Sequence, residues 1–347
     1  MTIGPRATKE ARRTMSFQQG EVEVAASLET QAIEPQEEAI KGRSLRQIAW
    51  RQLKQDRVAM TGGVGIIVVL ILAIFGPLIN DAYGQQPNAY HSDLTSIDTN
   101  LPLGSFGGAT GAHWLGVEPT NGRDILARII AGARVSLFIS VSAVILSLVL
   151  GLLVGVLAGY YRGWVDAVLA RVLDVLLAFP SLLFALALLA IFNQSPSFLG
   201  MHGQTLNFAV VIFVLGFFGF AYLARIVRGQ VLSIREKEFV DAARSLGASD
   251  WRILSREVLP NLVGPVTVWL TLTIPVYILG EAGLSFLGVG VQPPTASWGG
   301  MLSTAANTME NDPLYLVWPG LALFLTVLSF NLFGDGLRDA LDPKSTR

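Results

Sequence analysis

The sequence contains no cysteine and only three histidines, His91, His113 and His202, among its 347 residues. Without cysteine the chain can form neither disulfide bonds nor thiolate metal sites, and it has no thiol nucleophile. The histidines are scattered along the chain, which argues against a metal centre. Charged residues make up 15% of the chain, against about 25% in a typical soluble domain. The net charge of −1 argues against nucleic acid or another polyanion as a partner.

Patterns for common catalytic chemistry are missing as well. The sequence has no Gly-Lys dipeptide, so the Gly-x-x-x-x-Gly-Lys loop that binds nucleotide phosphates is absent. It has no His-Glu-x-x-His pattern, and no serine, histidine and acid on converging segments. We therefore expect a chain that is not an enzyme and binds no cofactor of its own.

Hydrophobic residues are abundant, at 52% of the chain, and they fall in uninterrupted blocks. Such blocks are expected where lipid is the solvent. The first, Val58–Ile79, has 22 residues without a charge and would form a helix of about 33 Å, enough to cross the hydrocarbon core. The sequence predicts an all-α integral membrane protein with six transmembrane helices, at residues 58–79, 135–161, about 170–192, 206–224, about 262–283 and about 314–334.

Polar segments divide the chain around these helices. The predicted divisions are a disordered cytoplasmic tail (1–43), a basic amphipathic helix with the first transmembrane helix (44–80), an extracytoplasmic loop (81–129), a core with the other five transmembrane helices (130–339) and a second cytoplasmic tail (340–347). The end of the extracytoplasmic loop, Arg123–Arg134, is predicted to be a short interfacial helix.

The distribution of lysine and arginine predicts the orientation. Of 25 such residues, 22 lie in segments that six helices would place on one side, and only Arg123, Arg128 and Arg134 lie on the other. Because basic residues gather on the cytoplasmic side of bacterial inner membranes, both termini and the 225–261 loop are predicted to be cytoplasmic.

Small residues and charges mark further positions in the predicted helices. Gly151, Gly155 and Gly159 are spaced four apart, on one helix face, which favours close helix packing over a solute path. Asp166, Arg171 and Asp174 lie at the cytoplasmic start of the third predicted helix.

Arg171 and Asp174 are three apart and could form an ion pair, so we favour a structural role for these charges over gating. Glu281 lies near the outer end of the fifth predicted helix. It could cap the glycine-containing segment 283–290 or contact the amino group of a passing peptide, and we favour the structural role.

The 225–261 segment is long for a connector and has the pattern of a helix–turn–helix. Phe239, Ala242, Ala243 and Leu246 form an apolar stripe on a charged helix. Gly247 suits the left-handed position that ends this helix, and Ser249 or Asp250 can cap a second helix, 251–258, which Pro260 would end. Periodicity alone leaves two interpretations open, a connecting hairpin or an element that docks into a partner protein.

The same segment resembles the EAA loop of ABC importer permeases. The match consists of Asp241-Ala242-Ala243, then three residues, Gly247, and finally Leu259-Pro260. The sequence departs from the family pattern at Asp241, where the family has glutamate, and at Glu257, where it often has isoleucine. Other strings, in order along the chain, resemble the C-type permeases of dipeptide, oligopeptide and nickel importers: Asn121–Leu126, Gly132–Leu137, Ala178–Pro180, Glu281–Gly288, Pro293-Pro294 and Ser297–Gly299.

The resemblance implies a type I ABC importer permease, in which this loop couples to the ATPase. The residues implied in coupling are Glu238, Asp241, Ala242, Ala243, Gly247, Leu259 and Pro260. The implied partners are a homologous B-type permease, two cytoplasmic ATPase subunits that bind the ATP, an extracytoplasmic substrate-binding protein and a peptide substrate, within the lipid bilayer. Nickel or another small solute remains open as the cargo. An ATP-independent secondary transporter or channel is the alternative of another class, although the sequence shows no convincing internal repeat.

Overall fold

The computed structural model describes residues 45–193 and 197–341. The chain divides into two units, residues 1–47 and 48–347, and the second holds all the helices after Gln55. The predicted tail 1–43 lies outside the described residues, and so do residues 342–347 of the predicted tail 340–347.

The described residues are mostly helical. The α-helices are α2 (Leu45–Gln55), α3 (Arg57–Tyr83), α4 (Ile125–Tyr160), α5 (Trp164–Ala178), α6 (Ser181–Asn193), α7 (Gly203–Ile234), α8 (Glu238–Ser245), α9 (Asp250–Ile253), α10 (Leu259–Phe286), α11 (Trp298–Ala306) and α12 (Pro313–Leu341). A 3-10 turn covers Ser92–Leu94, and a π-helical turn covers Leu254–Val258. Strands β1 (Ser197–Phe198) and β2 (Met201–His202) form a small antiparallel hairpin.

Within the described residues, five helices are long and apolar enough to cross a membrane: α3, α4, α7, the continuous run Asp250–Phe286, and α12. A sixth crossing requires α5 and α6 together, and these are bent by 77°. The prediction of one continuous third helix over 170–192 is therefore wrong. Pro180 follows the break, and Phe179 before it is extended (φ −76°, ψ 135°), because the proline ring disfavours helical backbone at the preceding residue.

The second predicted helix is longer than expected. The Asp124 carboxylate accepts a hydrogen bond from the Ala127 amide (2.7 Å) and begins α4 at Ile125, so 123–134 is not a separate interfacial helix. The 36 residues of α4 span about 54 Å, more than the ~30 Å hydrocarbon core, and the helix therefore extends beyond it.

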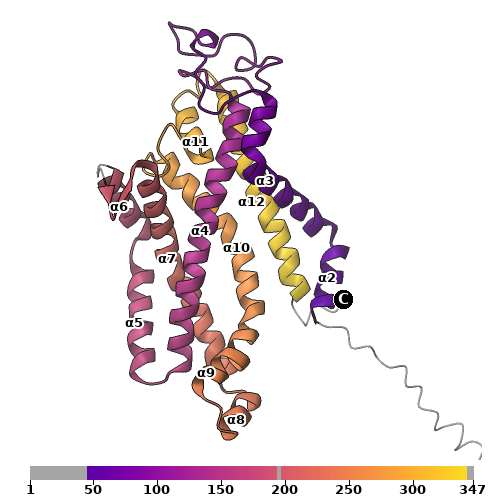
Figure 1. Ribbon diagram of the computed structural model, residues 1–347, viewed down its shortest axis with the longest axis vertical. Helices are drawn as coiled ribbons and strands as arrows, with labels where there is room; N and C mark the ends of the chain where they lie inside the picture. The colour runs from indigo at the N-terminus through magenta and orange to yellow at the C-terminus, as the bar shows by residue number, and fades with distance from the viewer. Residues whose placement is uncertain (1–44, 194–196, 342–347) are drawn as a thin grey trace, which may run out of the picture. The chain divides into compact units, whose positions relative to one another are not determined.

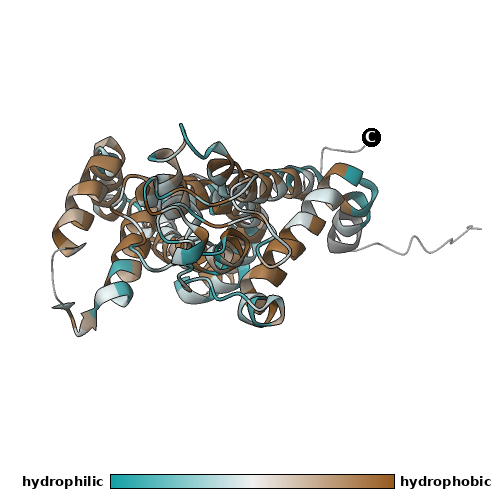
Figure 2. Ribbon diagram, turned by 90° about the horizontal axis from the view of Figure 1, so that it is seen from above, coloured by the Kyte–Doolittle hydropathy of each residue, from teal (hydrophilic) through white to brown (hydrophobic). Residues whose placement is uncertain are grey.

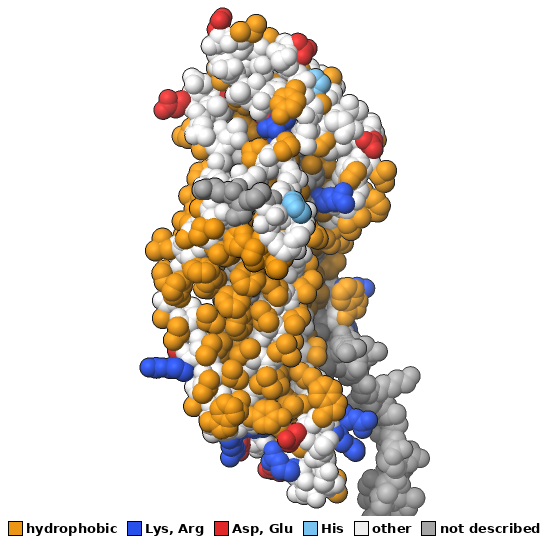
Figure 3. Space-filling model, turned by 60° about the vertical axis from the view of Figure 1, so that its left-hand side comes forward, with side chains coloured by type: hydrophobic (Ala, Val, Ile, Leu, Met, Phe, Trp, Pro, Cys, Tyr) orange, Lys and Arg blue, Asp and Glu red, His pale blue; other side chains and the backbone are white. Residues whose placement is uncertain are grey.

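Helix α4 packs against α3, α5, α7 and α10, while α3 also lies against α12. Figure 1 shows α8 at one end of this unit, hereafter the α8 end, and the non-helical residues 84–124 at the opposite end. On the face that Figure 3 shows, apolar side chains cover the surface between the two ends, and charged side chains gather toward the ends. The view from above shows mainly hydrophobic helices (Figure 2). This distribution fits a lipid-facing surface.

Residues 84–124 are folded rather than extended away from the helices. Glu118 is fully buried and forms ion pairs with Arg123 and Arg128, the latter at 3.1 Å. The Tyr315 hydroxyl of α12 donates to Oε2 of the same carboxylate (3.1 Å), the oxygen that also pairs with Arg128. The Tyr83 hydroxyl donates to the Asp124 carboxylate (3.0 Å), and Nδ1 of His113 lies 2.8 Å from the same oxygen. These contacts fix the segment to α3, α4 and α12.

Candidate functional site

The α8 end carries the segment that the sequence singles out. Helix α7 continues to Ile234, well past the predicted end of the fourth transmembrane helix, and α8 follows after a short turn. Val240 anchors α8, since its side chain is fully buried in a cluster with Ile253, Leu254 and Val258. The segment 225–261 is thus helical through most of its length, and α8 packs against residues 253–258 of the same segment.

The outer surface of this tip carries large apolar side chains among exposed charged ones. Three large apolar side chains are exposed there: Phe239 is 43% exposed, Leu246 88% and Trp251 75%. Leu246 and Trp251 flank the corner between α8 and α9. Exposed aromatic and leucine side chains at a charged tip are typical of a surface that a partner protein covers.

Gly247 lies at that corner in the left-handed conformation, with φ +79°. Its amide donates to the Arg244 carbonyl, and the Ala248 amide donates to the Ala243 carbonyl, both at 3.0 Å, which closes α8. A β-carbon added at Gly247 would meet no atom within 4 Å, so the corner is open on its outer side. Ala242 beside it is exposed and Ala243 is half-buried.

The second half of the tip differs from expectation. Ser249 occupies the cap position but makes no side-chain cap hydrogen bond, and the Asp250 carboxylate instead accepts from the Tyr160 hydroxyl (2.7 Å). The prediction that Pro260 ends a helix is wrong, because Leu259 and Pro260 begin α10. The Leu259 amide donates to the carbonyl of Leu254, five residues earlier, which forms a π turn. Pro260 follows in the first turn of α10, where the missing amide of a proline is tolerated.

Two ion pairs tie α5 to α7 near the α8 end. The Arg228 guanidinium donates to both oxygens of Asp166, at 2.5 and 2.9 Å. Asp174 pairs with Arg225 of α7, so the predicted pair between Arg171 and Asp174 is wrong. The helical spacing allowed that pair, but Asp174 binds Arg225 of α7 instead. Arg171 has no ion-pair partner among the described residues.

The base of the tip is fixed to the end of α4. Arg235 donates to the carbonyls of Gly159 and Tyr160, at 2.7 and 3.1 Å, and so satisfies the free carbonyls of the α4 terminus. Arg162 in the next turn pairs with Glu236, and this hydrogen-bonded guanidinium lowers the pKa of the Glu236 carboxyl. The tip is thereby connected to the helix that runs through the unit.

The three glycines of α4 face α7. An added β-carbon at Gly155 would lie 2.7 Å from the Ala224 carbonyl oxygen, and one at Gly159 would lie 2.6 Å from the Val231 side chain. At Gly151 it would lie 2.8 Å from Leu223. The absence of side chains at these positions lets the two backbones approach closely.

Glu281 is fully buried in α10. Its carboxylate accepts from the Ser285 hydroxyl (2.7 Å), and the Ser285 oxygen in turn accepts from the Val291 amide (3.0 Å). This chain of hydrogen bonds fastens the segment after α10 to the helix. Glu281 lines neither of the two cavities described next.

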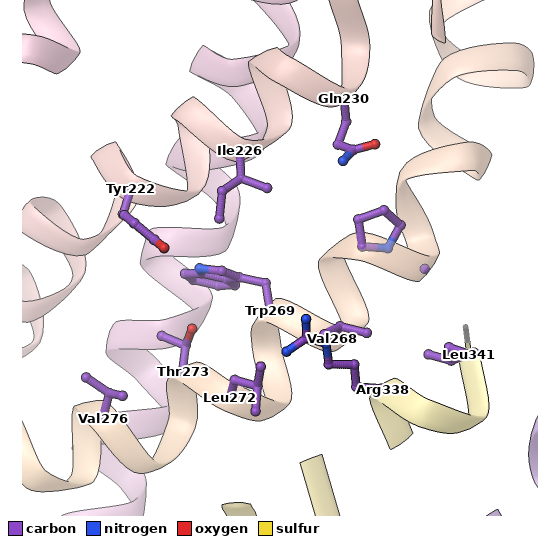
Figure 4. A pocket seen from close by; sticks show the side chains of 12 residues that line it. Tyr222, Ile226, Gln230, Val268, Trp269, Leu272, Thr273, Val276, Arg338 and Leu341 are labelled. Atoms are coloured by element: carbon purple, nitrogen blue, oxygen red, sulfur yellow. The ribbon is translucent and has the colours of Figure 1, made fainter. Parts of the chain in front are cut away.

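Periodicity did not reveal two cavities beside α10. One of about 930 Å³ lies near the α8 end, between α7, α10 and α12 (Figure 4). One of about 280 Å³ lies between α6, α7 and α10. Val276 lines both. Five of the α10 residues that line them lie four apart on one face, a signal visible in the sequence once α10 is placed: Val268, Leu272, Val276, Gly280 and Leu284.

The fold is that of an ABC importer permease. The chain is similar to a solved structure described as inward-facing conformations of the MetNI methionine ABC transporter, with a TM-score of 0.51 and 18% identity over 63% of this chain and 98% of the other. A second crystal form of MetNI gives the same TM-score with 16% identity. At this identity the likeness shows the fold alone.

The family model for the binding-protein-dependent transport system inner membrane component matches residues 151–347, and the model for the N-terminal domain of oligopeptide transport permease C matches 44–102. The chain belongs to this family of ABC importer permeases, multi-pass proteins of the inner membrane whose partners are ATPase and substrate-binding subunits. It is 41% identical over 295 residues to the glutathione transport system permease protein GsiD of Escherichia coli O6:K15:H31 and of Shigella boydii serotype 4, covering 85% of this chain and 89% of each relative.

Proposed function

We propose that the chain forms half of the translocation pathway for dipeptides and oligopeptides and couples to separate ATPase subunits through residues 225–261. The observation that carries the coupling role is the tip itself, where an open left-handed Gly247 lies between the exposed side chains of Leu246 and Trp251. A partner surface can approach this corner closely because no β-carbon stands on it.

In this proposal the α8 end faces the cytoplasm and residues 84–124 face the outside. The excess of lysine and arginine in the segments at the α8 end supports that orientation. The ATPase subunits would dock on α8, and the substrate-binding protein would deliver cargo at the opposite end. A homologous, non-identical B-type permease would supply the other half of the pathway.

A peptide cargo is favoured over nickel by the chemistry of the cavity walls. Among the described residues, neither cavity is lined by a histidine, cysteine, methionine, aspartate or glutamate, the side chains that bind transition metals. A peptide cargo is also consistent with the similarity to relatives named as glutathione permeases. The ATP-independent alternative would need a chain of buried ionisable groups along the helices, and the cavity linings supply only Arg338.

Reconstitution tests this function directly. Vesicles that contain this chain, the partner permease, both ATPases and the binding protein should accumulate a labelled tripeptide when ATP is supplied, and should not accumulate nickel. Vesicles that contain only this chain and the ATPases should accumulate neither. Uptake by that reduced set, or uptake without ATP, would contradict the proposal.

A further inference from the structure

Among the polar side chains that line the larger cavity, hydrogen-bond donors predominate. Its polar side chains are Tyr222 and Gln230 of α7, Trp269 and Thr273 of α10, and Arg338 of α12. Figure 4 shows these side chains directed from three helices toward one space. The indole and the guanidinium can only donate, and among the described residues no carboxylate lines the cavity to accept from them.

These groups have no partners in the part of the chain that the structure describes. None of the five polar side chains makes a hydrogen bond or an ion pair there. Thr267 and Thr271 of the same helix differ, because their hydroxyls donate to the carbonyls of Val263 and Val268. Tyr222 is 60% exposed, and Gln230 and Arg338 are exposed as well, so the polar groups of this set are accessible to a bound solute or water.

Arg338 is the only charged residue that lines this cavity. It lies near the end of α12, and neither Asp335 nor Asp339 of the same helix pairs with it. In Figure 4 its side chain reaches from α12 toward α10. A guanidinium that makes no ion pair within the described residues fits a carboxylate, which it can bind through two parallel hydrogen bonds.

We propose that this cavity is a solute-binding chamber that takes the carboxylate end of a peptide, with Arg338 as the carboxylate-binding residue. The inference rests on the proposed function and adds the site and the recognised group. The volume of about 930 Å³ lies within the ~300–1,000 Å³ typical of small-molecule sites. Apolar residues such as Ile226 and Leu272 would pack against the solute's carbon atoms.

The second cavity continues the first along α10. Val276 joins the two, and Phe218 and Leu284 make the wall beyond it apolar. A peptide in the chamber would therefore direct its carboxylate toward the α8 end and its remaining side chains toward the apolar cavity. This arrangement predicts a preference for a free carboxyl terminus, since an amidated terminus would leave the Arg338 charge unpaired.

The absence of cysteine makes a direct test possible. Thr273→Cys places a single thiol in the cavity of the complete complex, and its modification can be read on this chain by mass spectrometry. The anionic reagent sulfonatoethyl methanethiosulfonate and the cationic trimethylammonioethyl reagent should differ in rate. Arg338→Gln should shift the anion-to-cation rate ratio by about fivefold toward the cation, because a unit charge about 8 Å away in water changes the two rates by about twofold each, in opposite directions.

Arg57→Gln is the matched control. Arg57 is an exposed arginine at the first residue of α3, without an ion-pair partner among the described residues, and it does not line the cavity. That variant should leave the rate ratio unchanged. An unchanged ratio in Arg338→Gln would overturn the assignment. A thiol that reacts in the isolated chain but not in the complex would also overturn it, because a partner helix would then fill the cavity.

Protection identifies the recognised group. Millimolar triglycine should slow modification of Thr273→Cys, triglycine amide should not, and Arg338→Gln should abolish the difference. Equal protection by both probes, or none by either, would refute carboxylate recognition. ATP-driven uptake measured on the same preparation separates the two proposals. Uptake without carboxylate-dependent protection would refute this site alone, and protection without uptake would refute the proposed function alone.

Discussion

Asp166 of α5 and Arg228 of α7 are joined by two hydrogen bonds, of 2.5 and 2.9 Å, between the guanidinium and both carboxylate oxygens. Both side chains are partly exposed, at 26% and 29%. Two ion pairs hold α5 against α7, and in this one both carboxylate oxygens are bound. Because α5 continues through the bend at Pro180 into α6, this contact fixes the position of the bent helix pair.

We expect Asp166→Asn to weaken this attachment and to lower the free energy of unfolding by about 1 kcal/mol, the upper part of the range for partly exposed ion pairs. The exchanged double variant, Asp166→Arg with Arg228→Asp, should recover most of the loss. Thermal unfolding of the purified chain measures both. Arg171→Gln, which removes an arginine of α5 without an ion-pair partner among the described residues, should have no effect. A loss in Arg171→Gln equal to that in Asp166→Asn would contradict the pairing seen here.

The buried Glu118 predicts a larger effect. Glu118→Gln would leave Arg123 and Arg128 without their counter-charge in a buried site, a change that typically costs about 3–5 kcal/mol. We expect residues 84–124 to detach from α4 and α12. Limited proteolysis would report this as new cleavage within residues 84–124. Glu310→Gln, at an exposed and unpaired glutamate on the same end, should leave the digestion pattern unchanged. Resistance of Glu118→Gln to protease would show that the network is dispensable.

The contact between α4 and α7 leaves no room at Gly155. In Gly155→Ala the new methyl group would lie 2.7 Å from both the Ala224 carbonyl oxygen and the Val227 side chain, so one backbone must move. Such overpacking typically costs about 1–3 kcal/mol. We expect a lower melting temperature and a lower yield of folded chain. Gly229→Ala in α7, where an added β-carbon meets nothing within 4 Å, should instead gain up to about 1 kcal/mol from helix propensity. Equal behaviour of the two variants would contradict this packing.

Long apolar runs predicted much of the fold. Helices α3, α4, α7, α10 and α12 each contain a predicted transmembrane segment, because lipid demands about 20 apolar residues in a row wherever a helix crosses. The bend before Pro180 was not predicted, since a proline within an apolar run can be tolerated or can break the helix. Local spacing cannot decide between those outcomes.

Contacts between distant residues explain the other differences. Arg225, rather than the neighbouring Arg171, pairs with Asp174 across 51 residues of chain, and Tyr315 reaches Glu118 across 197. The Gly247 corner was predicted because it depends on one short segment. The cavity was not, because its lining comes from α7, α10 and α12 together.

The orientation is open to chemical labelling. If the α8 end faces the cytoplasm, a membrane-impermeant maleimide added to intact cells should not modify Ser249→Cys, whose position is exposed at the tip. The same reagent should modify Ile97→Cys, because Ile97 is 94% exposed in the segment at the opposite end. Permeabilised cells should show modification at both positions. Modification of Ser249→Cys from outside, with Ile97→Cys protected, would reverse the proposed topology.

Gly247 offers the sharpest test of the coupling role. In Gly247→Val a branched side chain would occupy a left-handed position, which costs about 1–2 kcal/mol or more, and would stand on the corner where the partner is proposed to approach. Because the site lies at the tip and touches no other element, we expect normal membrane insertion. Peptide uptake should fall severely, and the ATPases should either dissociate or hydrolyse ATP without responding to loaded binding protein.

Gly247→Asn separates backbone strain from steric exclusion at this corner. Asparagine accepts the left-handed conformation more readily than valine but still presents a side chain to the partner. If the corner is a docking surface, both variants should lose ATPase retention and transport at matched expression. If only Gly247→Val fails, backbone strain rather than docking is the cause. Ser233→Ala, at an exposed residue in the last turn of α7, should transport normally. Normal transport and ATPase retention in both Gly247 variants would show that the segment only connects α7 to α10.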